Sequence, residues 1–116
     1  MKYLLLIYHD GDADWSEDDR AAALADYDRF NADYGARGVL RGGAELQPVS
    51  TATTVRVREG QTLLTDGPFA ETKEHLAGYY VVECETLDEA LEIAAAVPSA
   101  SVGSIEVRPQ VEGEEP

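Results

Sequence analysis

The sequence predicts one α+β domain in which two helices cover one face of an antiparallel sheet. Residues 2–8 form an unbroken apolar run, which is typical of a central strand. Residues 53–58 alternate between apolar and basic side chains, as a half-exposed strand does. Residues 17–34 and 87–97 instead repeat apolar residues at helical spacing. A chain of 116 residues is long enough for one modest core.

The first helix is expected to begin after Ser16, which can form a weak capping box with Asp19. Its apolar face is expected to contain Ala23, Tyr27, Phe30 and Tyr34. Gly35 and Gly38 are expected to stop it, because glycine is the usual residue just past a helix end.

A strand over residues 39–46 follows the first helix. Its Gly42–Gly43 pair indicates a bulge, or a close approach by a ligand or another backbone. Residues 53–58 and 62–65 then predict a hairpin that turns at Glu59–Gly60. This hairpin is an insertion into the plan formed by the other elements.

The second half of the chain begins with a strong turn signal at residues 66–69. The charged stretch over residues 70–78 is compatible with a short helical turn. A strand over residues 79–84 precedes the second helix, for which Thr86 and Glu89 supply a capping box. The predicted apolar face of that helix comprises Leu87, Ala90, Leu91, Ala94 and Val97.

With a last strand over residues 104–108, the order without the hairpin is βαββαβ, the ferredoxin-like arrangement. The two helices leave one sheet face uncovered. An open apolar face needs a partner, and a second copy related by two-fold symmetry is the simplest one. The domain is expected over residues 1–109, followed by a disordered acidic tail over residues 110–116.

The formal net charge of -14 argues against binding to nucleic acids or to anionic membranes. No apolar run approaches the roughly 20 residues that a membrane span needs. The apolar start is too short for a signal peptide, and His9-Asp10 follows it instead of a cleavage site. Cys84 is the single cysteine, so an internal disulfide is excluded, and we expect it to be buried. Together these features predict a cytoplasmic protein.

Several short motifs carry a family resemblance. The most specific is DGPFAETKE at residues 66–74, followed by Leu76 and by Gly78-Tyr79-Tyr80. Shorter matches are MKYLLLIY at residues 1–8, Leu46-Gln47-Pro48, Thr54-Val55-Arg56 and Leu87-Asp88-Glu89-Ala90. In these motifs the chain resembles the DGPF-domain branch of the YCII-related proteins, from Lys2 to Arg108.

The resemblance implies a dimeric ferredoxin-like α+β barrel. Most members of the family have no assigned reaction, but some relatives in the wider YCII group are lyase-like enzymes with a His–Asp pair, including one that removes chloride from a chlorinated hydroxyquinol. DGPF members also occur beside, or fused to, extracytoplasmic-function sigma factors, which implies a sensing or regulatory role. The histidine of the His–Asp pair comes from the first helix, whereas residues 17–36 contain no histidine here. That dyad is therefore not carried over to this chain.

The candidate catalytic residues are Asp66, Glu71 and Lys73. Asp66 is a candidate general base or polar anchor for a ligand, but its carboxylate can equally accept backbone N–H groups and hold the turn. Glu71 and Lys73 combine a carboxylate with an amine, which can tune pKa values for proton transfer. The alternative for this pair is a solvated loop with surface ion pairs.

The candidate ligand-binding residues are Glu74, His75, Tyr79 and Tyr80. His75 titrates near neutral pH, although a lone histidine beside a charged run is more often simply exposed. Tyr79 and Tyr80 point to opposite sides of their strand, and each is more often a packing residue. Arg56 and Arg58 form a positive pair that can bind a carboxylate or only decorate an exposed hairpin.

No metal and no cofactor is expected. His9 and His75 lie far apart in the sequence without matching carboxylates, and no phosphate-binding loop or nucleophile motif is present. Three hypotheses remain, and whether the protein is an enzyme stays open. In the first, the protein binds a small organic ligand in the cleft of a homodimer, in a sigma-factor-linked regulatory context. In the second, it is a cofactor-free lyase or isomerase that uses Asp66 with Glu71 or Lys73. In the third, it is a structural dimer that supports another protein.

Overall fold

The computed structural model describes residues 1–10, 16–69 and 74–112. Its elements, in chain order, are β1 (Lys2–His9), α1 (Glu17–Ala36), β2 (Leu40–Glu45), η1 (Val49–Thr51), β3 (Thr53–Arg58), β4 (Gln61–Asp66), β5 (His75–Glu83), α2 (Leu87–Ala96), η2 (Pro98–Ser101) and β6 (Ser104–Pro109). Four strands form an antiparallel sheet in the order β2-β5-β1-β6, and β3 pairs with β4 in a separate two-stranded sheet.

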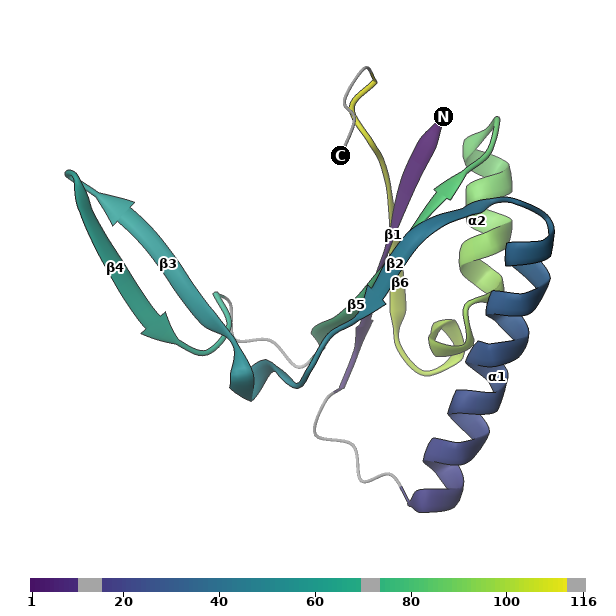
Figure 1. The fold of residues 1–116 in the computed structure, drawn as a ribbon, viewed down its shortest axis with the longest axis horizontal. Coiled ribbons are helices and arrows are strands. Elements are labelled where there is room, and N and C mark those ends of the chain that lie inside the picture. Colours follow the sequence, from purple (N-terminus) through teal and green to yellow (C-terminus); the bar gives the residue numbers. More distant parts are fainter. Residues whose placement is uncertain (11–15, 70–73, 113–116) are drawn as a thin grey trace.

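Helices α1 and α2 lie on the same face of the four-stranded sheet (Figure 1). The central strands β5 and β1 come from different halves of the chain, and the edge strands β2 and β6 flank them. The predicted α+β class with an antiparallel sheet and two helices is therefore confirmed, and the arrangement is compatible with a ferredoxin-like fold.

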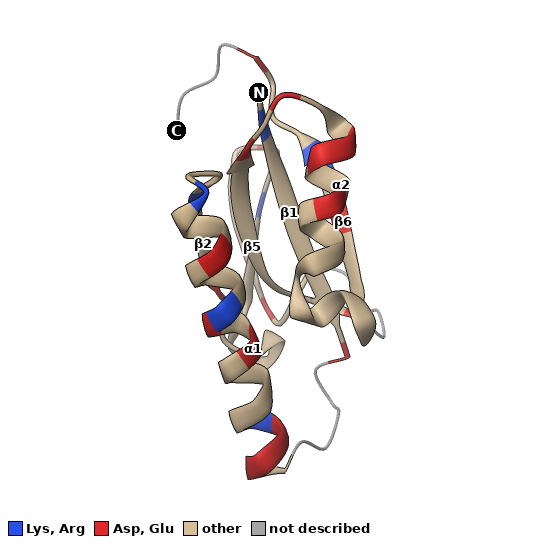
Figure 2. Cartoon of the chain, turned by 90° about the vertical axis from the view of Figure 1, so that its right-hand side faces the viewer, with Lys and Arg blue, Asp and Glu red and all other residues tan. Residues whose placement is uncertain are grey.

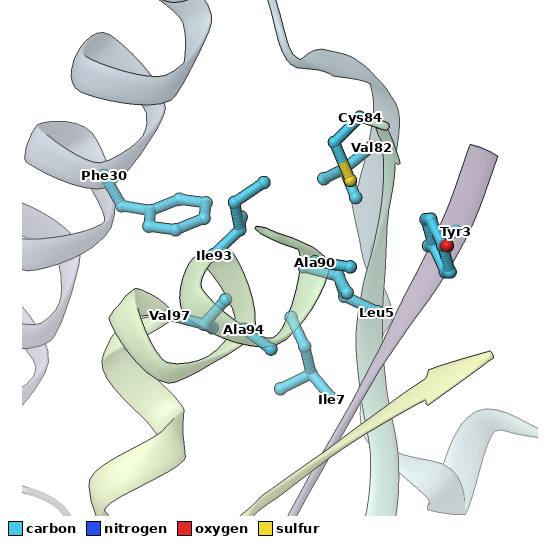
Figure 3. Close-up of a cluster of buried hydrophobic side chains, with 10 residues drawn as sticks. All are labelled: Tyr3, Leu5, Ile7, Phe30, Val82, Cys84, Ala90, Ile93, Ala94 and Val97. Atoms are coloured by element: carbon cyan, nitrogen blue, oxygen red, sulfur yellow. The ribbon is translucent and has the colours of Figure 1, made fainter. Parts of the chain in front are cut away.

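The core lies between the sheet and the two helices (Figure 3). Successive residues of a strand point to opposite faces, so β1 directs Tyr3, Leu5 and Ile7 toward the helices. The buried cluster consists of these three residues with Phe30, Val82, Cys84, Ala90, Ile93, Ala94 and Val97. Leu5 and Val82 are completely buried, which places the centre of the core on the β1–β5 pair.

Side-chain caps begin both helices as predicted. Ser16 Oγ accepts a hydrogen bond from the Asp19 N–H at 3.0 Å, and an Asp19 carboxylate oxygen accepts one from the Ser16 N–H at 3.2 Å. Thr86 Oγ1 accepts a hydrogen bond from the Glu89 N–H at 3.2 Å. These bonds satisfy N–H groups that have no partner inside a helix, and so they fix where each helix starts.

Of the two glycines that were predicted to stop α1, only Gly38 lies beyond the end of the helix. Gly35 lies inside the helix, which continues to Ala36. Gly38 follows with a φ of 73°, a left-handed conformation that glycine adopts without steric strain. Phe30 is buried as predicted, and Tyr27 and Tyr34 pack against the core.

The predicted face of α2 was also partly wrong. Ala90, Ala94 and Val97 are buried, but Leu87 and Leu91 are 48% and 47% exposed. Ile93 is buried in their place. The sequence of α2 is apolar on several sides, so its pattern is compatible with more than one face. Packing against the sheet selects the face with buried residues at positions i, i+3, i+4 and i+7.

Strand β5 begins at His75, four residues before the predicted start, so residues 75–78 form a strand and no helical turn. Pairing with β1 explains this, because Tyr8 and His9 are opposed to Leu76 and His75, whereas the register with β2 begins only at Gly78. The predicted close approach at Gly42–Gly43 is confirmed, and the approaching group is backbone. A Cβ built on Gly43 would lie 2.7 Å from the Tyr79 carbonyl oxygen, and one on Gly78 would lie 2.7 Å from the Ala44 carbonyl oxygen.

Strands β3 and β4 form an arm that projects away from the sheet (Figure 1). They are joined at Glu59–Gly60, where both φ angles are positive, as in the tight turns that favour Asn-Gly and related pairs. Every residue of β4 is exposed, as is all of β3 except the half-buried Thr54. The radius of gyration is accordingly 16.1 Å, against about 13 Å for a compact domain of this length.

Acidic residues are spaced along α1 and α2 (Figure 2). Within residues 1–10, 16–69 and 74–112, no helix is both long and apolar enough to cross a membrane.

The predicted C-terminal tail begins at Gln110, whose N–H donates a hydrogen bond to the Lys2 carbonyl at 2.9 Å. Residues 113–116, most of the predicted tail, lie outside the described part of the chain.

Tyr80 joins β5 to α1. Its ring centroid lies 5.1 Å from that of Phe30, and its hydroxyl donates a hydrogen bond to Asn31 Oδ1 at 2.5 Å. Burial of the phenol raises the pKa of Tyr80 to about 12, with the nearby Tyr27 adding to the effect. The hydroxyl is thus held in its neutral form in the folded state.

Replacing Leu5 with Ala should lower the free energy of unfolding by about 2–5 kcal/mol, because it removes a completely buried side chain at the centre of the core. Urea denaturation followed by circular dichroism measures this change. The control is Leu24→Ala, since Leu24 is 64% exposed on α1 and should change stability by at most about 0.5 kcal/mol. Equal losses in the two variants would contradict this position of the core.

Tyr80 should also make stability depend on pH at alkaline values. Its folded-state pKa lies above the ordinary value of 10.0. The contribution of Tyr80 to the free energy of unfolding is therefore fully present below pH 10 and is lost as the pH rises toward 12. Thermal unfolding across this range should show a steeper fall for the wild type than for Tyr80→Phe. Absorbance titration of the phenolates provides a second readout, in which the variant should lack the tyrosine that titrates near pH 12. Identical pH profiles for the two proteins would rule out this contribution of Tyr80.

Candidate functional site

A pocket of about 660 Å³ lies where the β3–β4 arm joins the four-stranded sheet. Its lining comes from the end of β1, the segment between β2 and β3, the turn after β4 and the start of β5. The residues are Tyr8, Leu46, Gln47, Pro48, Val49, Thr51, Ala52, Pro68, Phe69, Glu74, His75 and Leu76. This volume lies within the roughly 300–1,000 Å³ typical of small-molecule sites.

The sheet side of the pocket depends on an irregularity in the β1–β5 pair. The register shifts between Ile7 and Tyr8, so that Ile7 is paired with Gly78 whereas Tyr8 is paired with Leu76. Ile7 is buried toward the helices, and alternation therefore directs Tyr8 to the opposite, uncovered face. Because directly opposed residues project to the same side, Leu76 lies on that face with Tyr8.

The arm side of the pocket depends on the turn after β4. The Gly67 N–H donates a hydrogen bond to the Ala52 carbonyl at 2.7 Å, and the Thr54 hydroxyl donates one to the Gly67 carbonyl at 2.9 Å. Gly67 has a φ of 101°, which only glycine adopts without strain. These bonds hold the following Pro68 and Phe69 at the pocket.

Asp66 is the exposed last residue of β4 and does not line the pocket. Among the residues that the structure describes, its carboxylate makes no hydrogen bond, so the turn is held by the backbone of Gly67 and the side chain of Thr54. Glu71 and Lys73, the other two candidate catalytic residues, lie outside the described part of the chain.

Glu74 and His75 are the two predicted ligand-binding residues that line the pocket. The Ser104 hydroxyl donates to the Glu74 carboxylate, with oxygen–oxygen distances of 3.1 and 3.4 Å. Ser104 begins β6, and this bond therefore ties the carboxylate to the sheet. Tyr79 and Tyr80 do not line the pocket: Tyr79 lies opposite Leu6 on the uncovered face, and Tyr80 packs against Phe30 on the helical side.

The structure brings together two histidines that are 66 positions apart in the sequence, because His9 and His75 are directly opposed across β1 and β5. Gly103 packs against the same point, since a Cβ there would lie 3.0 Å from the His9 Cβ. His9 Nδ1 is buried and has no hydrogen-bond partner within the described ranges. Those ranges contain no group of three or more His, Cys, Asp or Glu residues that could hold a metal ion.

Cys84 is buried next to the end of β5, as expected. Its thiol donates a weak hydrogen bond to the Thr86 carbonyl at 3.5 Å. Burial, and secondarily the negative charge of Glu89, raises the pKa of the Cys84 thiol. The neutral thiol is therefore favoured, which argues against Cys84 as a nucleophile.

The apolar residues of the pocket, among them Tyr8, Leu46, Val49 and Phe69, were missed by reasoning from residue chemistry. A usable signal was nevertheless present. The end of the MKYLLLIY run, the Leu46-Gln47-Pro48 motif and the DGPF motif are far apart in the sequence, yet all three contribute to this lining. Motifs that share no element and meet at one cavity indicate a common role there.

Two comparisons with known proteins agree. Residues 1–112 match the sequence profile of the YCII-related domain. An uncharacterised protein of Rhizobium meliloti (strain 1021) is 41% identical over 113 residues, an alignment that covers 94% of this chain and 91% of the relative. Because the profile covers nearly the whole length, the chain belongs to the YCII-related domain family.

Proposed function

We propose that the protein binds a small organic ligand in the pocket between the sheet and the arm. The observation that carries this proposal is the composition of the lining, which is mostly apolar with a few polar groups. Leu46, Pro48, Val49 and Leu76 would contact an apolar body. Such lining, with a few polar groups to fix orientation, is typical of small-molecule sites.

The polar groups give the ligand a direction. Glu74 keeps a fixed position because Ser104 donates to it from β6, so it can accept a hydrogen bond from a ligand hydroxyl or amine. The DGPF motif supplies Pro68 and Phe69 to the lining. On this basis we also assign the chain to the DGPF branch of its family, in which the motif would help to form the pocket.

We further propose that a second copy of the chain covers the uncovered sheet face. This face carries Leu4, Leu6 and Tyr8 from β1, with Tyr79 and Val81 opposite them on β5. All five are only half-buried in a single chain. A contiguous apolar face of this kind usually marks an interface. Because Tyr8 and Leu76 lie on it, the partner copy would border the pocket.

Catalysis is a second candidate function, because Glu74 and His75 lie at the wall where a ligand would bind. A carboxylate and an imidazole are the usual groups for moving a proton to or from a bound molecule. A lyase or isomerase would turn over the bound compound, whereas a ligand sensor in a sigma-factor-linked context would not. Chromatography of the compound after incubation with the protein separates the two functions.

Ligand binding should raise the melting temperature of the purified protein in a screen of small carboxylates, phenols and quinones, because a ligand that prefers the folded state stabilises it. Replacing Ala52 with Leu fills the pocket and should abolish the increase. The matched control is Ala25→Leu on the exposed side of α1, which should respond like the wild type.

Two outcomes would count against the binding pocket. A hit whose effect survives in Ala52→Leu would place the ligand elsewhere on the protein. No increase across the whole screen would favour the structural dimer that supports another protein, and the search would then turn to protein partners.

The dimer should be visible as a solution mass of twice 12.6 kDa, measured by light scattering at micromolar concentration. Leu6→Glu puts a charge on the uncovered face and should reduce the mass to that of one chain, since a buried unpaired charge is costly. Leu24→Glu, on the exposed side of α1, should leave the dimer intact. A wild-type mass of 12.6 kDa would refute the dimer.

A further inference from the structure

A cation lies at the arm side of the pocket. The guanidinium carbon of Arg56, on β3, is 5.1 Å from the centroid of the Phe69 ring, and Phe69 is a lining residue. A guanidinium within about 6 Å of an aromatic face is held there by cation–π attraction. Arg56 does not itself line the pocket, but it is exposed, as is Phe69 at 74%, so neither group is enclosed within the chain.

We propose that the pocket selects a ligand with an apolar, aromatic body and a carboxylate group, and that Arg56 binds the carboxylate. This inference rests on the proposed ligand-binding function and specifies its ligand class. The guanidinium is suited to the task because it stays charged at every physiological pH and offers planar N–H donors that match a carboxylate. Stacking on Phe69 limits its motion, which lowers the entropy lost when it binds.

The two sides of the pocket set the orientation of such a ligand. Glu74 places a carboxylate on the sheet side, where Ser104 fixes it. Arg56 places a positive charge on the arm side. A carboxylate group of the ligand would be repelled by the first and attracted by the second. The ligand's anionic end therefore points toward the arm, and its apolar body lies against Leu46 and Leu76.

The net charge of -14 works against binding of any anion. Most of that charge is distributed over the molecule, including α1 and α2 on the far side of the sheet (Figure 2). At physiological salt, exposed charges beyond about 8 Å are largely screened, whereas a contacting guanidinium is not. The overall charge predicts that a neutral amide binds more tightly than the matching carboxylate, and the local cation predicts the reverse. A comparison of the two compounds therefore decides between these predictions.

Arg58 provides a matched control for Arg56. It lies two residues further along β3, on the same side of the strand, and is exposed. It is nearer the tip of the arm, opposite Gln61, and its guanidinium donates to the Val57 carbonyl rather than contacting a lining residue. A change that depends only on the charge of the arm would affect both arginines equally.

The test is isothermal titration calorimetry with 2-naphthoate and 2-naphthamide, which share an aromatic body and differ in charge. The wild type should bind naphthoate more tightly than naphthamide. Arg56→Gln should weaken naphthoate binding by about tenfold or more, because a charge-assisted hydrogen bond is lost, and should leave naphthamide binding unchanged. Arg58→Gln should bind both probes like the wild type, and Arg56→Lys, which keeps the charge, should bind naphthoate with intermediate affinity.

Each other outcome has a defined meaning. Equal binding of the two probes by the wild type, or a preference for the amide, overturns the role of Arg56 while the ligand pocket stands. Equal losses in Arg56→Gln and Arg58→Gln also overturn it, in favour of a general effect of charge. Binding of neither probe overturns the inference and removes aromatic ligands from the proposed function. Melting temperatures of the free variants confirm that each is folded, as expected for substitutions of exposed residues.

Discussion

The structure depends on β1, whose two edges are paired and whose two faces are both apolar. Its pairing with β5 on one edge and β6 on the other satisfies the backbone and joins the two halves of the chain. One face of β1 buries Tyr3, Leu5 and Ile7 against the helices. The other face presents Leu4, Leu6 and Tyr8, and so the same eight residues form the centre of the core, the uncovered face and one wall of the pocket.

A second constraint is the attachment of the arm. An isolated two-stranded hairpin is only marginally stable in water, and the exposed residues of β3 and β4 bury little surface. The bonds from Gly67 to Ala52 and from Thr54 to Gly67 fasten the root of the arm. The pocket exists because this root brings Phe69 and Pro68 beside the end of the sheet. Gly67, Pro68 and Phe69 of the DGPF motif thus lie at the junction of the two sheets.

Electrostatics give this junction its chemical character. The protein carries 23 acidic against 9 basic residues, so a basic side chain at a pocket is a specific local feature rather than a sample of the average surface. Arg56 contacts the lining residue Phe69, and the lining residue Glu74 accepts a hydrogen bond from Ser104. In the proposed binding mode, these opposite charges favour a polar ligand in one orientation.

Sequence periodicity and capping residues determined most of the local structure. The apolar run of β1 and the alternation of β3 were sufficient to predict two strands, and the caps at Ser16 and Thr86 were sufficient to predict where the helices begin. Each of these features depends only on residues that are neighbours in the chain. The α+β class followed from these elements. The motifs also pointed to the YCII-related family, and two of the four proposed ligand-binding residues, Glu74 and His75, line the pocket.

Tertiary structure alone decided the features that depend on residues far apart in the sequence. The buried face of α2 was ambiguous until the sheet selected Ile93 over Leu91, and β5 extended to His75 because β1 pairs with it as far as His9. The opposition of His9 and His75 and the contact of Arg56 with Phe69 likewise follow from strand register and from the turn at Gly67. A sequence read along one dimension determines which segments are helices and strands; only packing determines which side chains meet.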